Sequence, residues 1–252
     1  ARILSGNRPL HTELERAISG LIGAEDAVVL VGGHSTNASI IPHLYGPGDL
    51  VIHDALVHDS IQQGIKASGA SRHAFAHNQV DSLERALTAR RGHFRRVLVV
   101  TEGVFSMDGD IAELPGVVAA ARRHGAHVMV DEAHSIGVLG AGGGGVCQEL
   151  GVDPNEVDIL MGTLSKSLSS CGGYIAGRTP FIQHLRYALS SLVFSAGLTP
   201  ANTAASVAAI DMMAREPERL GRLRGNAQYF LEGAKARGLD TGDAVGVPVV
   251  PV

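Results

Sequence analysis

The chain carries the stretch His-Val-Met-Val-Asp-Glu-Ala-His at residues 127–134. Its apolar first half predicts a buried strand that ends at Asp131, and His134 follows three residues later on the next turn. A carboxylate at a strand end suits a ring nitrogen that must stay protonated, because the nearby negative charge favours the cationic form. We therefore expect a buried strand that delivers a functional carboxylate to one edge of a sheet.

Other interpretations of this stretch remain open or fail on the rest of the sequence. Asp131 would also serve as a capping residue for a following helix. The letters Asp-Glu-Ala-His resemble a helicase motif, but no G-x-x-x-x-G-K-[ST] loop occurs anywhere in the chain. A metal site built from Asp131, Glu132 and His134 lacks a further cluster with convincing ligand spacing, so we expect no metal.

A second stretch, Met-Gly-Thr-Leu-Ser-Lys-Ser-Leu at residues 161–168, places Lys166 just after another apolar run. Lys166 follows Asp131 by 35 residues, which is enough for one further helix and strand, so two neighbouring strand ends could hold both side chains around one ring. A desolvated lysine becomes nucleophilic enough to form an imine. Hydroxyl groups suited to a phosphate surround it, on Thr163, Ser165, Ser167, Ser169 and Ser170. The alternative is a surface lysine in a serine-rich turn.

Short apolar runs alternate with longer helical patterns along the whole chain. The runs rich in valine and isoleucine predict strands at Ala27–Val31, Leu50–His53, Val97–Thr101, Val128–Asp131, Val157–Met161 and Tyr174–Ala176. Helical patterns cover His11–Ile22, Gln79–Arg90, Leu114–Gly125 and Pro200–Arg215. Strands separated by helices imply parallel pairing with right-handed crossovers. We therefore expect an α/β fold, a three-layer α/β/α sandwich with a mostly parallel central sheet.

Three weaker signals complete the set of candidate residues. Val-Gly-Gly-His-Ser-Thr-Asn at residues 31–37 predicts a glycine turn before a helix, where the backbone amides of Gly33 and His34 would cap a phosphate. His58 offers a flat ring that would stack on a planar cofactor, although a lone histidine is more often structural. The run Gly140–Gly145 contains G-x-G-x-x-G but does not directly follow a strand, so we expect a flexible active-site loop instead of a dinucleotide site.

Composition limits the class of protein. A hydrophobic content of 45% and a charged content of 18% are typical of a globular chain, and 252 residues suffice for one large domain. A net charge of -4 gives no electrostatic reason to expect nucleic acid, and no apolar run is long enough to span a membrane. Cys147 and Cys171 suggest neither a disulfide framework nor a zinc site, so we expect a cytoplasmic protein.

With these pieces in place, the chain resembles the α-oxoamine synthase family of fold-type I pyridoxal-phosphate enzymes. The resemblance runs almost end to end and is most specific in Thr-Glu-Gly-Val-Phe-Ser-Met-Asp-Gly-Asp (101–110) and Asp-Glu-Ala-His-Ser-Ile-Gly (131–137). It also covers Ser-Gly-Asn-Arg-Pro-Leu-His (5–11), Ala-His-Asn (76–78) and Thr-Leu-Ser-Lys (163–166).

The resemblance implies a role for each candidate residue around pyridoxal 5'-phosphate. Lys166 would carry the cofactor as a Schiff base, Asp131 would pair with the pyridinium nitrogen, and His134 would bond the phenolic oxygen. His58 would stack on the ring, while Glu102 and Ser106 would line the site. The phosphate would be held by Gly33, His34 and Thr163, and by Ser195 across the interface of a homodimer.

The implied reaction is a decarboxylative condensation of an α-amino acid with an acyl thioester, which gives an α-amino ketone. The acyl donor would be an acyl-CoA or, as the sequence around Gly33–Asn37 suggests, an acyl group on a carrier protein. Rival hypotheses are another fold-type I activity, such as an aminotransferase or an aldolase-like lyase, and a non-catalytic partner subunit. Such a subunit would be expected to lose the lysine, which is present here as Lys166.

Three positions depart from the pattern of the resembled family. Ser165 stands where the family usually has glycine, His34 where it has an aromatic residue, and Ala196 where a hydroxyl is common.

We further expect residues 1–240 to form the cofactor-binding large domain. Residues 241–252 would begin a C-terminal small domain that lies otherwise outside this sequence, together with the family's arginine for the substrate carboxylate.

Overall fold

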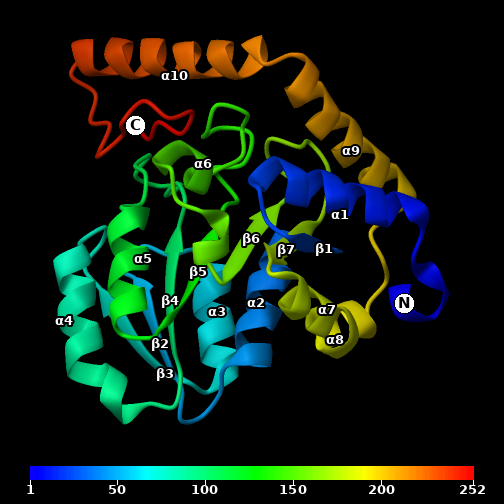
Figure 1. Cartoon of the computed structure of the whole chain (residues 1–252). Helices are drawn as coiled ribbons and strands as arrows, with labels where there is room; N and C mark the ends of the chain where they lie inside the picture. Colours follow the sequence, from blue (N-terminus) through cyan, green and yellow to red (C-terminus); the bar gives the residue numbers. More distant parts are fainter.

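A seven-stranded sheet runs through the centre of this computed structural model, which describes residues 1–252 (Figure 1). The strands lie in the order β1-β7-β6-β5-β4-β2-β3. Their bounds are β1 Asp26–Leu30, β2 Leu50–Asp54, β3 Ser71–Phe75, β4 Val97–Glu102, β5 His127–Asp131, β6 Ile159–Thr163 and β7 Gly173–Gly177. All six predicted strands are present, with ends that differ by no more than two residues.

The sheet is mostly parallel, as predicted, but one strand runs against its neighbours. Strands β3, β2, β4, β5 and β6 pair in parallel, whereas β7 is antiparallel to both β6 and β1. Only residues 164–172 join β6 to β7, and this connection is too short for the crossover that a parallel pair requires. The prediction of a mostly parallel sheet is therefore confirmed, with β7 as the one strand that runs against its neighbours.

The strand β3 was not predicted, and its position explains why. It forms the edge of the sheet, and its sequence Ser-Arg-His-Ala-Phe is largely exposed, with only Phe75 buried. An edge strand needs neither an apolar run nor a strict alternation, because water covers part of it.

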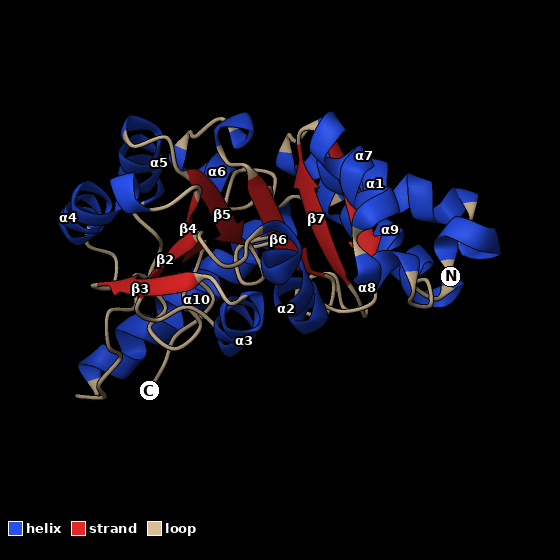
Figure 2. Cartoon of the chain, turned by 90° about the horizontal axis from the view of Figure 1, so that it is seen from below, coloured by secondary structure: helices blue, strands red, loops and turns tan.

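Helices cover both faces of the sheet and make the three-layer sandwich that the sequence predicted. Figure 2 shows α4 and α5 on one side of the sheet and α2 and α3 on the other. The helices are α1 Pro9–Ile22, α2 Gly33–Leu44, α3 Asp59–Ser68, α4 Val80–Arg90, α5 Leu114–Arg123, α6 Val146–Leu150, α7 Thr179–Ala188, α8 Ser190–Val193, α9 Pro200–Arg215 and α10 Glu218–Ala236. Short helical turns occupy Arg2–Gly6, Arg91–His93 and Pro154–Glu156.

Two apolar cores hold the layers together, and β4 contributes to both. Val97 and Val99 belong to the core that also contains residues of α1, α4, α5 and α9, whereas Leu98 and Val100 belong to the core that contains residues of α2, α3, α7 and α8. Because a strand's side chains alternate between its two faces, a strand buried on both faces is apolar throughout. This is why the central strands were recognisable from their sequence.

The parallel strands bring their carboxyl ends to one edge of the sheet. Glu102 at the end of β4 lies directly opposite Asp131 at the end of β5, and Asp131 lies opposite Met161 near the end of β6. The end of β1 reaches the same edge, because Leu30 and Thr163 both pair with Gly173 of β7. The helix α2, which follows β1, therefore starts beside the ends of β5 and β6.

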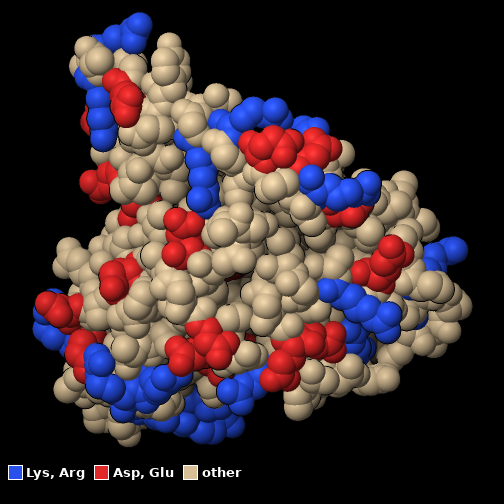
Figure 3. Space-filling model, turned by 45° about the horizontal axis from the view of Figure 1, so that its top comes forward, with Lys and Arg blue, Asp and Glu red and all other residues tan.

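The surface and the chain ends add little to the site. Acidic and basic side chains occur in neighbouring groups on the face shown in Figure 3, separated by uncharged areas. The helix α10 crosses one end of the molecule, and the residues after it turn back beneath it (Figure 1), where the Val245 amide donates to the Gly109 carbonyl at 3.3 Å. No helix combines the length and the apolar character needed to cross a membrane.

A buried carboxylate fixes the start of two central strands. Asp49 precedes β2 and accepts hydrogen bonds from Arg95 (3.0 Å) and Arg96 (2.8 Å), which precede β4. The hydrogen bonds from Arg95 and Arg96 hold the pKa of Asp49 well below its usual range. The ionised form of Asp49 is therefore the one that stabilises the fold.

We expect Asp49→Ala to lower the free energy of unfolding at pH 7 by about 2–3 kcal/mol, because charge-assisted hydrogen bonds are lost. A carboxyl with a depressed pKa in the folded state stabilises the fold above its ordinary pKa of about 3.9, and this contribution is lost as the pH falls further. In urea unfolding experiments, the difference between the variant and the parent protein should therefore shrink from pH 7 to pH 3. Asp243→Ala, which removes an exposed carboxyl, is the control, and an equal loss in both variants would contradict the assignment.

Candidate active site

A cavity of about 480 Å³ opens at the carboxyl edge of the sheet. The elements that form it are the start of α2, the start of α3, and the ends of β4, β5 and β6. Its lining residues are Gly32, Gly33, His34, Ser35, Asn37, His58, Ser60, Glu102, Asp131, Ala133, His134, Met161, Thr163, Ser165 and Lys166. Only two of these fifteen residues are hydrophobic, so the cavity offers a ligand many hydrogen-bonding groups.

Asp131 is held rigidly at the inner end of the cavity and is only 5% exposed. One carboxylate oxygen accepts the Ala133 amide at 2.9 Å, and the other accepts Asn37 Nδ2 at 2.7 Å. Burial raises the pKa of Asp131, and the hydrogen bond from Asn37 is the strongest effect that opposes this rise. The carboxylate is thus both oriented and stabilised in its charged form by two donors.

Lys166 lies on the loop that joins β6 to β7. The loop is closed by the Leu164 amide, which donates to the Gly172 carbonyl at 3.0 Å, and it contains Ser169 with a positive φ of 47°. Lys166 Nζ contacts His134 Nε2 and faces the open cavity. The cavity walls remove part of the water around the ammonium group, and this desolvation lowers the pKa of Lys166.

His134 is a neutral partner for this lysine. Burial lowers the pKa of His134 to about 4, and the positive charge of Lys166 adds to the effect. At neutral pH the ring therefore carries no charge and can accept from or donate to a ligand beside Lys166.

The start of α2 and the end of β6 together form an anion cradle. The first backbone amides of an α-helix have no partner within the helix, and α2 begins at Gly33 after the extended residue Gly32. A Cβ atom on Gly33 would lie 2.8 Å from Thr163 Oγ1, so only glycine lets the helix approach this hydroxyl. Thr163 Oγ1 lies 2.9 Å from Ser165 Oγ, which brings two hydroxyls next to these amides.

A second carboxyl, that of Glu102, lies beside Asp131 on the neighbouring strand. Burial raises the pKa of Glu102 to about 8, and the charge of Asp131 contributes to this rise. Glu102 Oε1 accepts the backbone amide of His58, the residue that caps α3 by accepting the Ser60 amide on its ring nitrogen. Burial thus favours the uncharged form of Glu102, and its hydrogen bond from the His58 amide ties α3 to the edge of the sheet.

The structure brings eight of the ten predicted site residues into this one cavity. They are Gly33, His34, His58, Glu102, Asp131, His134, Thr163 and Lys166. Ser106, in the turn after β4, and Ser195, after α8, do not line it in the single chain. Two further polar residues, Asn37 and Ser60, lie in the cavity wall although their sequence positions were not singled out. Their positions one helical turn after Gly33 and two residues after His58 are the only local signals that could have indicated them.

The glycine run Gly140–Gly145 has a different place from the one expected. None of its residues lines the cavity of Lys166, so the expectation of an active-site loop was wrong for this cavity. Gly142 and Gly143 line a separate, mostly apolar cavity of about 490 Å³ against α9 and α10. Glu132 fixes the end of the run by accepting the Val146 amide at 3.1 Å.

No group of three or more histidine, cysteine or acidic side chains is arranged to hold a metal ion.

Comparison with known proteins places the chain among a group of related enzymes. The family model described as aminotransferase class I and II matches residues 2–248. An 8-amino-7-oxononanoate synthase of Fervidobacterium nodosum is 41% identical over 254 residues, which cover 100% of this chain and 64% of that protein. Long chain base biosynthesis protein 2a of Oryza sativa subsp. japonica is 37% identical over 265 residues, covering 100% of this chain and 54% of that protein.

A solved structure agrees with these relatives. The serine palmitoyltransferase of Sphingomonas wittichii superposes with a TM-score of 0.90 at 36% identity, covering 94% of this chain and 59% of that one. The fold is thus that of the fold-type I pyridoxal-phosphate transferases, as the sequence predicted. The chain spans less than two thirds of the length of these relatives.

The lowered pKa of Lys166 leads to a chemical prediction. Because the neutral amine is the reactive form, Lys166 should be modified by an amine-specific acylating reagent at a lower pH than Lys66 and Lys235, which are both exposed on helices. Labelling at a series of pH values, followed by peptide mass spectrometry, measures the three lysines in one sample. Equal labelling curves would show that the cavity does not desolvate Lys166.

Proposed function

Because this chain belongs to the aminotransferase class I and II family, we propose that it is the cofactor-binding part of a pyridoxal-phosphate enzyme of the α-oxoamine synthase type. Such an enzyme condenses an α-amino acid with an acyl thioester and releases carbon dioxide, giving an α-amino ketone. The observation that carries this proposal is the single cavity that joins Lys166, Asp131 and the start of α2. The cofactor is pyridoxal 5'-phosphate.

The residues of the cavity fit this cofactor in kind and number. A phosphate needs amide and hydroxyl donors, which the start of α2, Thr163 and Ser165 would supply. A ring nitrogen that must stay protonated needs an ionised carboxylate, which Asp131 would supply. An aldehyde needs an amine of lowered pKa, which Lys166 would supply. When bound, the cofactor supplies an electron sink for negative charge that develops on the amino-acid carbon.

The other residues would control protons and exclude water. Lys166, once displaced by the amino group of the substrate, would take the proton from the amino-acid carbon and later return it. His134 would stay neutral and donate a hydrogen bond beside Lys166. His58 would cover one face of the bound ring, and Glu102, whose pKa burial raises, would hold His58 in place through the backbone amide.

The named relatives favour this reaction over the rival hypotheses. An 8-amino-7-oxononanoate synthase and a serine palmitoyltransferase are both α-oxoamine synthases, and neither relative is named as an aminotransferase or an aldolase. The presence of Lys166 argues against a non-catalytic partner subunit. Two of the residues that depart from the family pattern, His34 and Ser165, lie in the anion cradle. His34 would take the place of an aromatic residue, and Ser165 would take the place of a glycine.

The finer details of the proposal concern substrates and domains. The acyl donor would be an acyl-CoA or an acyl-carrier protein, and the protein would act in the cytoplasm. Residues 1–240 would form the large cofactor-binding domain, and residues 241–252 would begin a smaller C-terminal domain that binds the substrate carboxylate.

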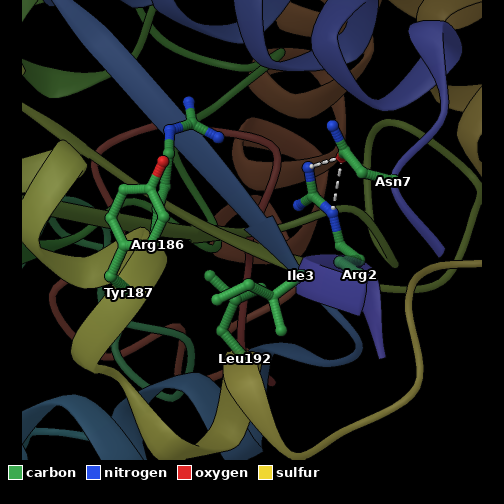
Figure 4. Close-up of a pocket in the computed structure, with 6 residues that line it drawn as sticks. All are labelled: Arg2, Ile3, Asn7, Arg186, Tyr187 and Leu192. Atoms are coloured by element: carbon green, nitrogen blue, oxygen red, sulfur yellow. Dashed lines mark hydrogen bonds between the residues drawn. The ribbon is translucent and has the colours of Figure 1, made fainter. Parts of the chain in front are cut away.

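We further propose that the enzyme acts as a homodimer through the surface next to the N-terminus. Leu4 and Phe194 are 84% and 86% exposed, although both are large and apolar. Between the segments that carry them lies a cavity of about 220 Å³, lined by Arg2, Ile3, Asn7, Arg186, Tyr187 and Leu192 (Figure 4). A second copy that covered this surface would bring the segment of Ser195 toward the cofactor phosphate of its partner.

The test of the reaction uses the purified protein that contains this chain, loaded with pyridoxal 5'-phosphate. Borohydride should attach the cofactor to Lys166, as peptide mass spectrometry would detect, and Lys166→Ala should fold but lose this adduct and all turnover. Asp131→Ala should slow the exchange of the amino-acid α-proton on the order of 100-fold, because the charge that stabilises the electron sink is lost. Release of carbon dioxide with an α-amino ketone identifies the reaction, whereas a keto acid with pyridoxamine phosphate would indicate an aminotransferase instead.

The proposed dimer leads to a separate measurement. Phe194→Asp should convert the dimer to monomers in light-scattering chromatography, because a charge would have to be buried at the interface. Tyr229→Asp, which changes an aromatic residue that is 81% exposed on α10, is the matched control and should stay dimeric. A Phe194→Asp protein that remains dimeric would rule out this surface.

A further inference from the structure

A continuous chain of hydrogen bonds links Asp131 to His58 through two buried side chains. Asn37 Nδ2 donates to Asp131 Oδ2 at 2.7 Å and lies 3.0 Å from Ser60 Oγ. Ser60 Oγ lies 2.7 Å from His58 Nδ1. Asn37 and Ser60 are each only 1% exposed, so water does not compete for these bonds. These hydrogen bonds therefore connect the Asp131 carboxylate with the ring of His58.

The orientation of the Asn37 amide is fixed by its neighbours. The NH₂ group faces Asp131, where Nδ2 donates to the carboxylate oxygen Oδ2 at 2.7 Å. The amide oxygen Oδ1 is buried and has no hydrogen-bond partner. A buried amide oxygen without a partner is unfavourable for folding, and an apolar residue of similar size would avoid it. The presence of asparagine at this buried position thus points to a role in the site.

The direction of the bonds determines which nitrogen of His58 carries the proton. Ser60 Oγ accepts from Asn37 Nδ2, so its own hydrogen is free to point at His58 Nδ1. The backbone amide of Ser60 also donates to His58 Nδ1, at 3.2 Å. With both donors on Nδ1, the proton of the uncharged ring must lie on Nε2.

The close packing of α2 on α3 holds Asn37 and Ser60 at hydrogen-bonding distance. Asn37 belongs to α2 and Ser60 to α3, and Gly64 lies one turn further along α3. A Cβ atom on Gly64 would lie only 2.6 Å from the Asn37 carbonyl oxygen, so glycine is needed for the helices to approach this closely. The spacing that brings Asn37 and Ser60 together is therefore built into the packing of α2 on α3.

We propose that Asn37 and Ser60 are positioning residues that orient the Asp131 carboxylate and hold His58 with its proton on Nε2. Asn37 acts through Asp131, and Ser60 acts through His58. The inference rests on the proposed function, because it assigns these roles toward pyridoxal phosphate. The hydrogen bond from Asn37 also opposes the effect of burial on the pKa of Asp131, which keeps the carboxylate available to a protonated ring nitrogen.

The tautomer of His58 is tested by nitrogen NMR of ¹⁵N-histidine-labelled protein without cofactor, with the signal assigned from His58→Gln. In the parent protein at a pH where the ring is uncharged, Nδ1 should give a pyridine-type shift and Nε2 a pyrrole-type shift. Ser60→Ala and Asn37→Ala should both move the two shifts toward each other as the tautomers mix. Ser39→Ala removes a hydroxyl two residues after Asn37 on α2, outside the cavity, and should leave the two shifts unchanged. Unchanged shifts in Ser60→Ala and Asn37→Ala would overturn the proposal.

The role toward the cofactor is tested by a pyridoxal-phosphate titration of the same proteins. Asn37→Ala should weaken binding by about 10-fold, as expected for loss of a group that orients a ligand-binding side chain, while Ser39→Ala binds like the parent protein. Equal affinity in Asn37→Ala and the parent protein would overturn the role of Asn37. A parent protein that binds no pyridoxal phosphate would instead refute the proposed function, and the tautomer measurement without cofactor would still decide the proposal on His58.

Discussion

The buried carboxylate of Asp131 is the constraint on which the site depends. An ionised group at the inner end of a cavity loses most of its hydration, so it requires donors that are fixed in place. The strand β5 brings the residue to the edge of the sheet, and the Ala133 amide and Asn37 supply those donors. Because Asn37 comes from α2, the packing of a helix on the sheet supplies a hydrogen bond that favours the charged form of a residue at the end of a strand.

The helix α2 serves two parts of the site at once. Its first turn presents free amides toward Thr163, and its second turn presents Asn37 toward Asp131. Both contacts depend on close approach, which Gly33 permits at the end of β6 and Gly64 permits against α3. An anion at the start of α2 and a ring nitrogen at Asp131 would therefore be held at a fixed spacing by one rigid element, which is how a site pre-organises a ligand.

The sequence determined the layers of this protein and most of its candidate site. Strands β4, β5 and β6 are buried on both faces, so their apolar runs were distinct, and the chemistry that follows each run falls at one edge because parallel strands end together. Lys166, Asp131 and His134 could be singled out since each stands directly after such a run. The edge strand β3 escaped prediction because it is largely exposed. The strand β7 was predicted, but its antiparallel direction was not, because that direction follows from the short connection after β6.

Other features were decided only by tertiary structure. No local pattern distinguishes Asn37 from other polar residues on a helix surface, and its contact with Asp131 spans elements far apart in the chain. The same holds for Glu102, whose raised pKa arises from burial and from a neighbouring strand. It holds also for the glycine run Gly140–Gly145, which lines a separate cavity beside Ser167–Ser169. A sequence records which groups are present and where strands end, whereas burial and hydrogen-bond partners, which set charge and orientation, exist only once the helices have packed on the sheet.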